Sequence, residues 1–180
     1  MLHKYDDTWL LNMRKNIMIS FVSDDDLFER LVLKGGNALE LVYRVTKRPS
    51  LDIDFSMADE FTTEEIPEVK GKILKALSNT FNKENLEVFD LRFEEKPAPD
   101  KRTNPRGGGY RISFKLIERS DVTEDLDIDK KRRRALHIAG TGTTFKVDIS
   151  KYEYCQNKVK KDIGSFTVYV YSPEMIVLEK

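Results

Sequence analysis

The chain has 180 residues, a length that suits one compact domain, and its 39% hydrophobic and 34% charged residues are typical of soluble globular proteins. The 31 basic and 31 acidic residues cancel, so the whole molecule is not a polycation that binds nucleic acid through its net charge. The single cysteine, Cys155, excludes an intrachain disulfide, and no apolar run reaches the roughly 18 residues of a membrane-spanning helix, so we expect a cytoplasmic protein with no membrane partner.

The N-terminal part of the chain predicts helices followed by a glycine turn. Apolar residues at helical spacing predict a helix over residues 5–20. The run Ser23–Asp26 predicts the start of a short second helix, and we interpret its three aspartates as helix caps rather than metal ligands. Residues 31–33 lead into Lys34-Gly35-Gly36, and the apolar spacing after Asn37 indicates that the two glycines open a third helix.

Residues 48–55 predict a strand whose two faces differ in chemistry. Successive side chains of a strand point to opposite faces, so the apolar face carries Leu51, Ile53 and Phe55 and the polar face carries Arg48, Ser50, Asp52 and Asp54. Two carboxylates about 6–7 Å apart along a strand suit a divalent cation, because hard cations prefer oxygen ligands. The preceding glycine pair lets the main chain approach a phosphate, and the N-terminus of a helix favours an anion. Together these features indicate phosphoryl or nucleotidyl transfer.

The middle of the chain predicts one helix and a hairpin. Helical spacing of apolar residues predicts a helix over residues 63–81, with Pro67 tolerated in its first turn. Residues 86–94 and 110–117 predict two strands. The intervening residues 96–109 contain three prolines and three consecutive glycines, which predict a loop at the tip of a hairpin.

The C-terminal part of the chain predicts a charged segment, two strands and the start of a helix. Residues 121–134 combine aspartates and glutamates with the basic run Lys130–Arg134, and we interpret them as a charged surface segment. Residues 146–150 and 166–171 predict strands, the second by its aromatic and β-branched content. Ser172 and the two residues after it predict the start of a helix, inside which the sequence stops.

Asp148 is the candidate for a third carboxylate. Two cations about 3.5–4 Å apart can activate an attacking oxygen and stabilise a leaving one, and such a pair needs a further carboxylate from a neighbouring strand. Val147 and Ile149 are apolar and would bury one face of their strand, which leaves Asp148 on the polar face. Asp127 and Asp129 compete for this place, but the segment before the basic run has poor strand character.

The motif KGG-x-A-L at residues 34–39, followed by R-x-S-x-D-x-D at residues 48–54, resembles the nucleotidyltransferase fold and most closely the AbiEii-type nucleotidyltransferase toxin family. The resemblance implies an α/β (α+β) fold in which helices flank a mixed β-sheet that carries the D-x-D pair. It also implies a bacterial toxin that moves a nucleoside monophosphate from a nucleoside triphosphate to RNA, such as a tRNA acceptor end, or to a protein. A cognate antitoxin would be its partner.

The family pattern Y-x-P-E-x-x-x-x-E-K matches residues 171–180, and in the family a helical part follows it. We therefore expect residues 1–180 to form a nucleotidyltransferase core domain that precedes such a part.

These features define one candidate site. Asp52, Asp54 and Asp148 would be the catalytic carboxylates and would hold Mg²⁺ or Mn²⁺. The phosphates of the nucleoside triphosphate would be bound by Lys34, Gly35, Gly36, Arg48, Ser50 and Lys180, the last of which matches the family lysine near the nucleotide.

Two other functions stay open at this point. The first is a nucleotidyltransferase that modifies a small molecule such as an antibiotic, and the zero net charge favours a small or protein acceptor over bulk RNA. The second is an inactive nucleotide- or RNA-binding module, against which the intact Asp52 and Asp54 argue. The sequence does not identify the base, the acceptor or the oligomeric state.

Overall fold

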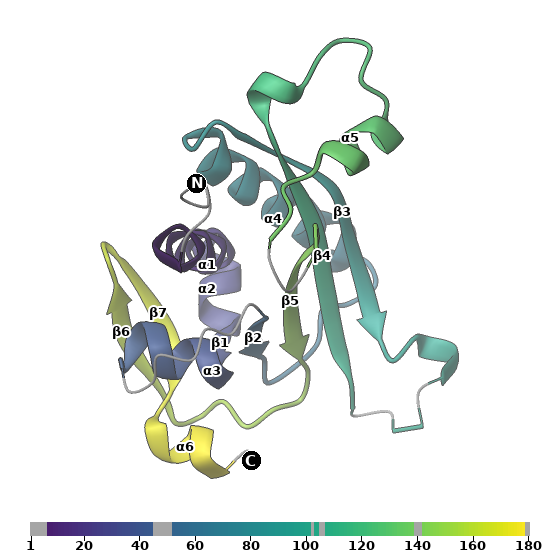
Figure 1. The fold of residues 1–180 in the computed structure, drawn as a ribbon. Helices are drawn as coiled ribbons and strands as arrows, with labels where there is room; N and C mark the ends of the chain where they lie inside the picture. The colour runs from purple at the N-terminus through teal and green to yellow at the C-terminus, as the bar shows by residue number, and fades with distance from the viewer. Residues whose placement is uncertain (1–6, 45–51, 102, 105–106, 139–141, 179–180) are drawn as a thin grey trace.

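The computed structural model describes residues 7–44, 52–101, 103–104, 107–138 and 142–178. Its centre is a seven-stranded mixed β-sheet with the strand order β3-β4-β5-β2-β1-β7-β6 (Figure 1). The strands are β1 (Val32–Lys34), β2 (Ile53–Ser56), β3 (Leu86–Lys96), β4 (Gly109–Glu118), β5 (Phe145–Ser150), β6 (Lys158–Ile163) and β7 (Phe166–Tyr171). The pairs β2–β5 and β1–β7 are parallel and the other neighbours are antiparallel. The predicted mixed sheet is therefore confirmed.

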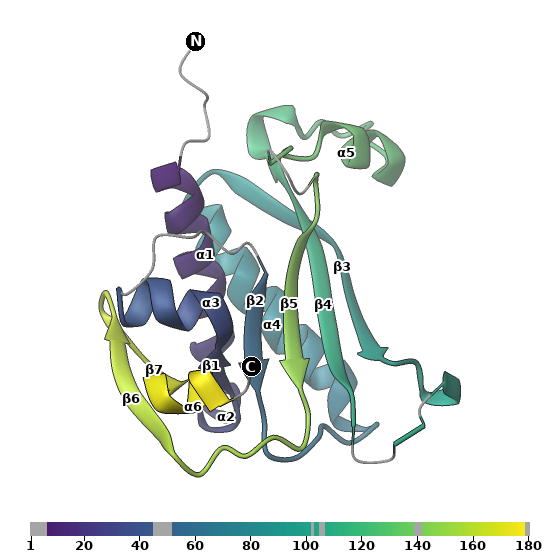
Figure 2. The same ribbon diagram turned by 60° about the horizontal axis from the view of Figure 1, so that its bottom comes forward.

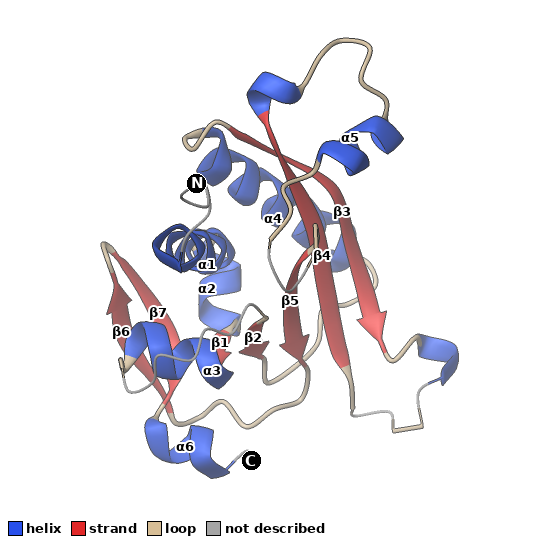
Figure 3. Cartoon of the chain, in the orientation of Figure 1, coloured by secondary structure: helices blue, strands red, loops and turns tan. Residues whose placement is uncertain are grey.

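Helices flank this sheet (Figure 3). They are α1 (Asp7–Val22), α2 (Asp25–Arg30), α3 (Gly35–Asn37), which continues as the π-helix η1 (Ala38–Val42), α4 (Glu65–Asn82), α5 (Ile128–Arg134), α6 (Pro173–Leu178) and the short 3₁₀ turns η2 (Pro99–Lys101) and η3 (Arg119–Asp121). In the described part of the chain, no helix combines the length and apolarity that crossing a bilayer requires. The α/β (α+β) class with helices around the sheet is confirmed.

The core lies between the sheet and the two long helices. Every fourth residue of α4 from Val69 to Phe81 is buried, and so is the stripe of α1 around Ile17, because both helices turn one apolar face to the sheet. Phe21 of α1 stacks on Phe55 of β2 with ring centroids 5.8 Å apart, and Phe81 of α4 lies 6.3 Å from Phe114 of β4. Figure 2 shows α4 behind β4 and β5. These contacts assign one face of β2, β5 and β4 to the core.

The opposite face of β2, β5 and β4, which we call the open face, carries the polar side chains. Ile53, Val147 and Ile112 are buried on the core side, whereas Asp54 and Asp148 alternate with them and are half-buried. At one end of the open face a small second cluster of Phe89, Ile117 and Ala135 packs under α5, with Val122 and Leu126 beside it. The middle of the open face is left for polar groups.

The predicted D-x-D strand is shorter than expected in the part that the structure describes. β2 begins at Ile53, and Asp52 precedes it in a bend. Residues 45–51, which include Arg48 and Ser50, lie outside the described residues. The alternation itself is confirmed for Ile53, Asp54 and Phe55.

Candidate active site

Four charged side chains lie in register across the open face. Lys34 of β1 is opposite Asp54 of β2, Asp54 is opposite Asp148 of β5, and Asp148 is opposite Arg111 of β4. Residues that face each other on paired strands share a face, and adjacent strands are about 4.8 Å apart. We call these four residues the charged row. Two carboxylates therefore stand side by side, with one cationic residue on each flank.

The carboxylate of Asp148 is held by Arg111. Nε of Arg111 donates to Oδ1 at 2.8 Å and Nη2 donates to Oδ2 at 2.7 Å, so the guanidinium binds both oxygens. This hydrogen bonding raises the pKa of Arg111, and the charges of Asp52 and Glu94 act in the same direction. Asp52 is exposed and lies outside the strand.

The arrangement has the donors that a hard cation needs. Within the described residues, no group of three or more His, Cys, Asp or Glu side chains is gathered closely enough to hold a metal ion. Both oxygens of Asp148 are bound by the Arg111 guanidinium, so a cation at this carboxylate would have to compete with that pair. The carboxylate oxygens of Asp54 and Asp148 are donors of the type that fits a hard cation.

The glycine turn lies directly against the charged row. Strand β1 passes into α3 at Gly35, which has a φ of +69°. A Cβ at this position would lie 2.9 Å from Oδ2 of Asp54. Glycine is required here both by the left-handed backbone and by the space that Asp54 takes. The predicted phosphate-binding turn and one predicted catalytic carboxylate are therefore in contact, with Gly36 next in the same helix.

The remaining predicted site residues divide into two groups. Lys34 is half-buried and its Nζ lies 3.8 Å from Oε1 of Glu153, so it belongs to the charged row but points toward that carboxylate. Arg48, Ser50 and Lys180 lie outside the described residues. Helix α6, which leads toward Lys180, begins as predicted, because Oγ of Ser172 accepts a hydrogen bond from the amide of Met175 at 3.4 Å.

Asn37 is a site residue that the sequence analysis missed. It is fully buried, and its Nδ2 donates to the main-chain oxygen of Asp52 at 2.7 Å. Its Oδ1 accepts from Nη1 of the buried Arg14 at 3.2 Å, and Arg14 also donates to both oxygens of Glu40, at 2.6 and 3.2 Å. This network ties α1 and η1 to the start of the D-x-D segment. An asparagine in an otherwise apolar helical stripe was the available signal.

Replacing Asn37 by alanine should lower stability by about 1–3 kcal/mol, because buried polar groups lose their partners. It should also weaken Mn²⁺ binding, since the main chain at Asp52 loses its anchor. Urea denaturation and Mn²⁺ titration measure the two effects. Asn12→Ala is the matched control, an exposed asparagine of α1 whose loss should change stability by less than about 0.5 kcal/mol. Equal losses in both variants would contradict the anchoring role.

A cavity of about 450 Å³ opens beside the charged row. Arg111 and Asp148 form one of its walls, and the main chain of Gly107–Gly109 and the side chain of Tyr152 contribute to the others. Close to it, the buried Nζ of Lys151 donates to Glu60 at 2.9 Å and to Glu95 at 2.5 Å. This ion pair fixes the end of β5 only three residues after Asp148. The cavity provides room for part of a ligand next to the carboxylates.

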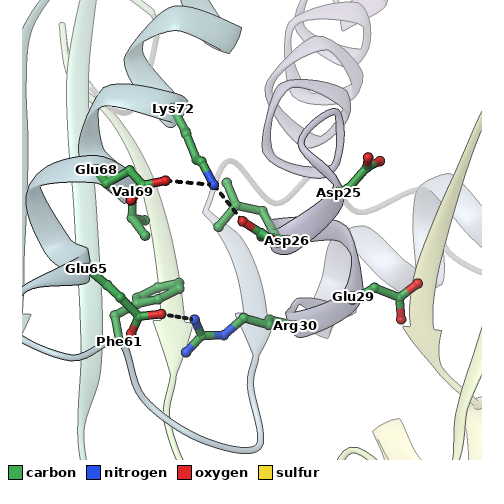
Figure 4. A pocket seen from close by; sticks show the side chains of 10 residues that line it. Asp25, Asp26, Glu29, Arg30, Phe61, Glu65, Glu68, Val69 and Lys72 are labelled. Carbon is green, nitrogen blue, oxygen red and sulfur yellow. Dashed lines mark hydrogen bonds and ion pairs between the residues drawn. The ribbon is translucent and has the colours of Figure 1, made fainter.

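A second cavity, of about 420 Å³, lies between α2 and α4 (Figure 4). Lys72 donates to Asp26 at 2.6 Å and forms an ion pair with Glu68 at 3.2 Å, while Arg30 donates to Glu65 at 3.1 Å. Asp24 accepts hydrogen bonds from the amides of Asp26 and Leu27 and caps α2. The interpretation as capping is confirmed for Asp24, while Asp25 and Asp26 lie in the first turn of α2. Around the cavity, Arg30 and Lys72 offset only part of the negative charge of the acidic side chains Asp25, Asp26, Glu29, Glu65 and Glu68.

A comparison with known protein families agrees with the motif. A family model described as "Nucleotidyl transferase AbiEii toxin, Type IV TA system" matches residues 16–180. No curated protein matches the chain. Among solved structures, the crystal structure of an H. pylori protein proposed to be a nucleotidyltransferase is 16% identical, with a TM-score of 0.49 over 97% of this chain and 58% of that one. The chain therefore spans less than two thirds of the length of that protein.

Proposed function

The chain belongs to the AbiEii nucleotidyltransferase toxin family, and we propose on this basis that it transfers a nucleoside monophosphate from a nucleoside triphosphate to an acceptor. The charged row is the observation that carries the proposal. It places Asp54 and Asp148 side by side on two parallel strands, and it places Gly35 against Asp54. Carboxylates next to a close main-chain approach are what transfer from a triphosphate needs.

In this proposal Asp52, Asp54 and Asp148 hold a divalent cation, Mg²⁺ or Mn²⁺. When bound, the cation supplies charge neutralisation between the attacking oxygen and the leaving pyrophosphate. The main chain of Gly35 and Gly36 binds the phosphates, because no Cβ keeps a phosphate oxygen away from the amides. Lys34, Arg48, Ser50 and Lys180 add hydrogen bonds and positive charge around the triphosphate.

The family supports a proposal for the acceptor and the partner. We propose a toxin of a bacterial toxin–antitoxin pair that acts in the cytoplasm, with RNA, including a tRNA acceptor end, or a protein as acceptor and with a cognate antitoxin. The cavity beside Asp148 supports a second candidate, because about 450 Å³ is enough for a small-molecule acceptor. The reaction at the charged row would be the same in both cases.

Radioactive labelling tests the activity and separates the acceptors. The protein is incubated with each α-labelled nucleoside triphosphate and Mg²⁺ or Mn²⁺, together with total RNA, total protein or a small-molecule extract. We expect label from one triphosphate to enter one fraction and to disappear when EDTA removes the cation. Label that enters no fraction with any of the four triphosphates, or that is unaffected by EDTA, would contradict the proposal.

A further inference from the structure

Arg111 stands between two carboxylates on neighbouring strands. Asp148 faces it across the β4–β5 pairing, and Glu94 faces it across the β3–β4 pairing. Only the first of these pairs has the two hydrogen bonds described above, while Glu94 lies 3.5 Å from Nζ of Lys96. All three residues share the open face, because facing residues of paired strands point to the same side. Arg111 therefore has a second carboxylate one strand away.

The Arg111–Asp148 pair and a cation compete for the same oxygens. Both oxygens of Asp148 accept from the guanidinium, and a metal ligand must offer lone pairs on these oxygens. A cation next to the guanidinium would also repel it. The side chains of Arg111 and Asp148 are 40% and 32% exposed, so neither is locked in place by packing. Arg111 can exchange its partner without rearrangement of the sheet.

We propose that Arg111 is a positioning residue that holds Asp148 in the cation-free protein and transfers to Glu94 when a divalent cation takes its place. This inference rests on the proposed function, because it assumes a cation at the carboxylates of the charged row. Until a cation arrives, the charge of Arg111 also offsets that of Asp148, which stands beside Asp54. The consequence is a low cation affinity of the free protein.

Mn²⁺ affinity without nucleotide, measured by electron paramagnetic resonance, tests this exchange on the whole chain. Arg111→Gln should bind Mn²⁺ about tenfold more tightly than wild type, because the competing charge is gone. Arg111→Lys should lie between the two, since an ammonium keeps the charge but cannot bind both oxygens in one plane. Glu94→Gln should bind about threefold more weakly, because Arg111 loses its second partner. Circular dichroism checks that each variant is folded.

Two comparisons make the result decisive. Arg92→Gln is the matched control, an exposed arginine of β3 beside Asp90 whose loss should change the affinity by less than about twofold. In an Asp148→Asn background, Arg111→Gln should likewise have less than about a twofold effect, because the competing pair no longer exists. Equal affinities of wild type and Arg111→Gln, with binding that still depends on Asp54, would overturn this inference alone. Absence of Asp54-dependent binding in every variant would overturn the cation site of the proposed function as well.

Discussion

Replacing Asp54 by asparagine should lower nucleotidyl transfer by about three orders of magnitude, the scale expected when charge stabilisation is lost at a transition state. Asp54 lies at the centre of the charged row, between Lys34 and Asp148, and its carboxylate abuts Gly35. Asparagine has nearly the same shape, so the contact with Gly35 is kept while the negative charge is lost. Initial rates of label transfer at saturating triphosphate measure the effect.

The fold of the Asp54→Asn variant should be retained. Asp54 is half-buried at the open face, and we expect a stability change of less than about 1 kcal/mol. Asp129→Asn is the control for the D-x-D motif, because residues 126–129 repeat the L-D-I-D sequence of residues 51–54 outside the charged row. Asp129 pairs with Arg132 on the exposed α5. That variant should keep full activity. An Asp54→Asn protein that loses activity only in proportion to its unfolding would show a structural role instead.

Gly109→Ala should lower the free energy of unfolding by about 3 kcal/mol, the upper range for overpacking a well-packed site. A Cβ at Gly109 would lie 2.0 Å from the main-chain oxygen of Ile149, inside the β4–β5 pairing and next to Asp148. Because the clashing oxygen of Ile149 belongs to the main chain, it cannot rotate away as a side-chain atom could. The two strands must therefore separate locally. Urea denaturation with a common m-value measures the loss.

Gly71→Ala is a control for which the expected change in the free energy of unfolding has the opposite sign. Gly71 lies inside α4, and nothing within 4 Å would meet its Cβ. Alanine should stabilise the protein there by about 0.5–1 kcal/mol, because it restricts the unfolded chain and favours the helix. If the two alanines changed stability by similar amounts, the close approach of β4 and β5 at Gly109 would not be a constraint.

Local sequence patterns predicted most of the helices and strands, because these elements are determined by residues within their own segments. The spacing of apolar residues in α4 and the alternation around Asp148 in β5 are properties of single segments. The glycine pair and the D-x-D motif were likewise readable as a turn and a polar strand face. The register that aligns Asp54 with Asp148 could not be predicted from the sequence, because it depends on the pairing of two segments far apart in the chain.

The elements that were missed depend on distant partners. Residues 128–134 lie on the surface as predicted, but they form the helix α5, which the sequence analysis did not predict. Lys131 pairs with Glu87 at 2.6 Å and Arg132 with Asp90 at 2.8 Å, and both carboxylates belong to β3. The lysine-rich β6 is an edge strand whose charges stay solvated, and Nζ of Lys158 lies 3.7 Å from the ring centre of Tyr169 on β7. Strand propensity disfavours the lysine-rich β6, and tertiary contacts override it.

The functional residues that were missed share this cause. Arg111, Asn37 and Lys151 each act through partners on other elements, namely Asp148, the main chain of Asp52 and the pair of Glu60 and Glu95. Nothing in the flanking sequence distinguishes Arg111 and Lys151 from ordinary polar residues, and the apolar residues around Asn37 mark its position without identifying its partner. Their roles become visible only when the strands are paired.

The parallel pairings of the sheet also determine how late in synthesis the charged row can assemble. The hairpins β3–β4 and β6–β7 join neighbours in sequence and form early, whereas Leu33 meets Val170 from the other end of the chain. Asp148 likewise comes to lie beside Asp54 only after β5 has been made and has paired with β2. A chain still on the ribosome therefore carries Asp54 without Asp148 until residues 145–150 have been made and paired. The charged row is consequently assembled late in the folding of this sheet, after the hairpin β3–β4 is available to receive β5.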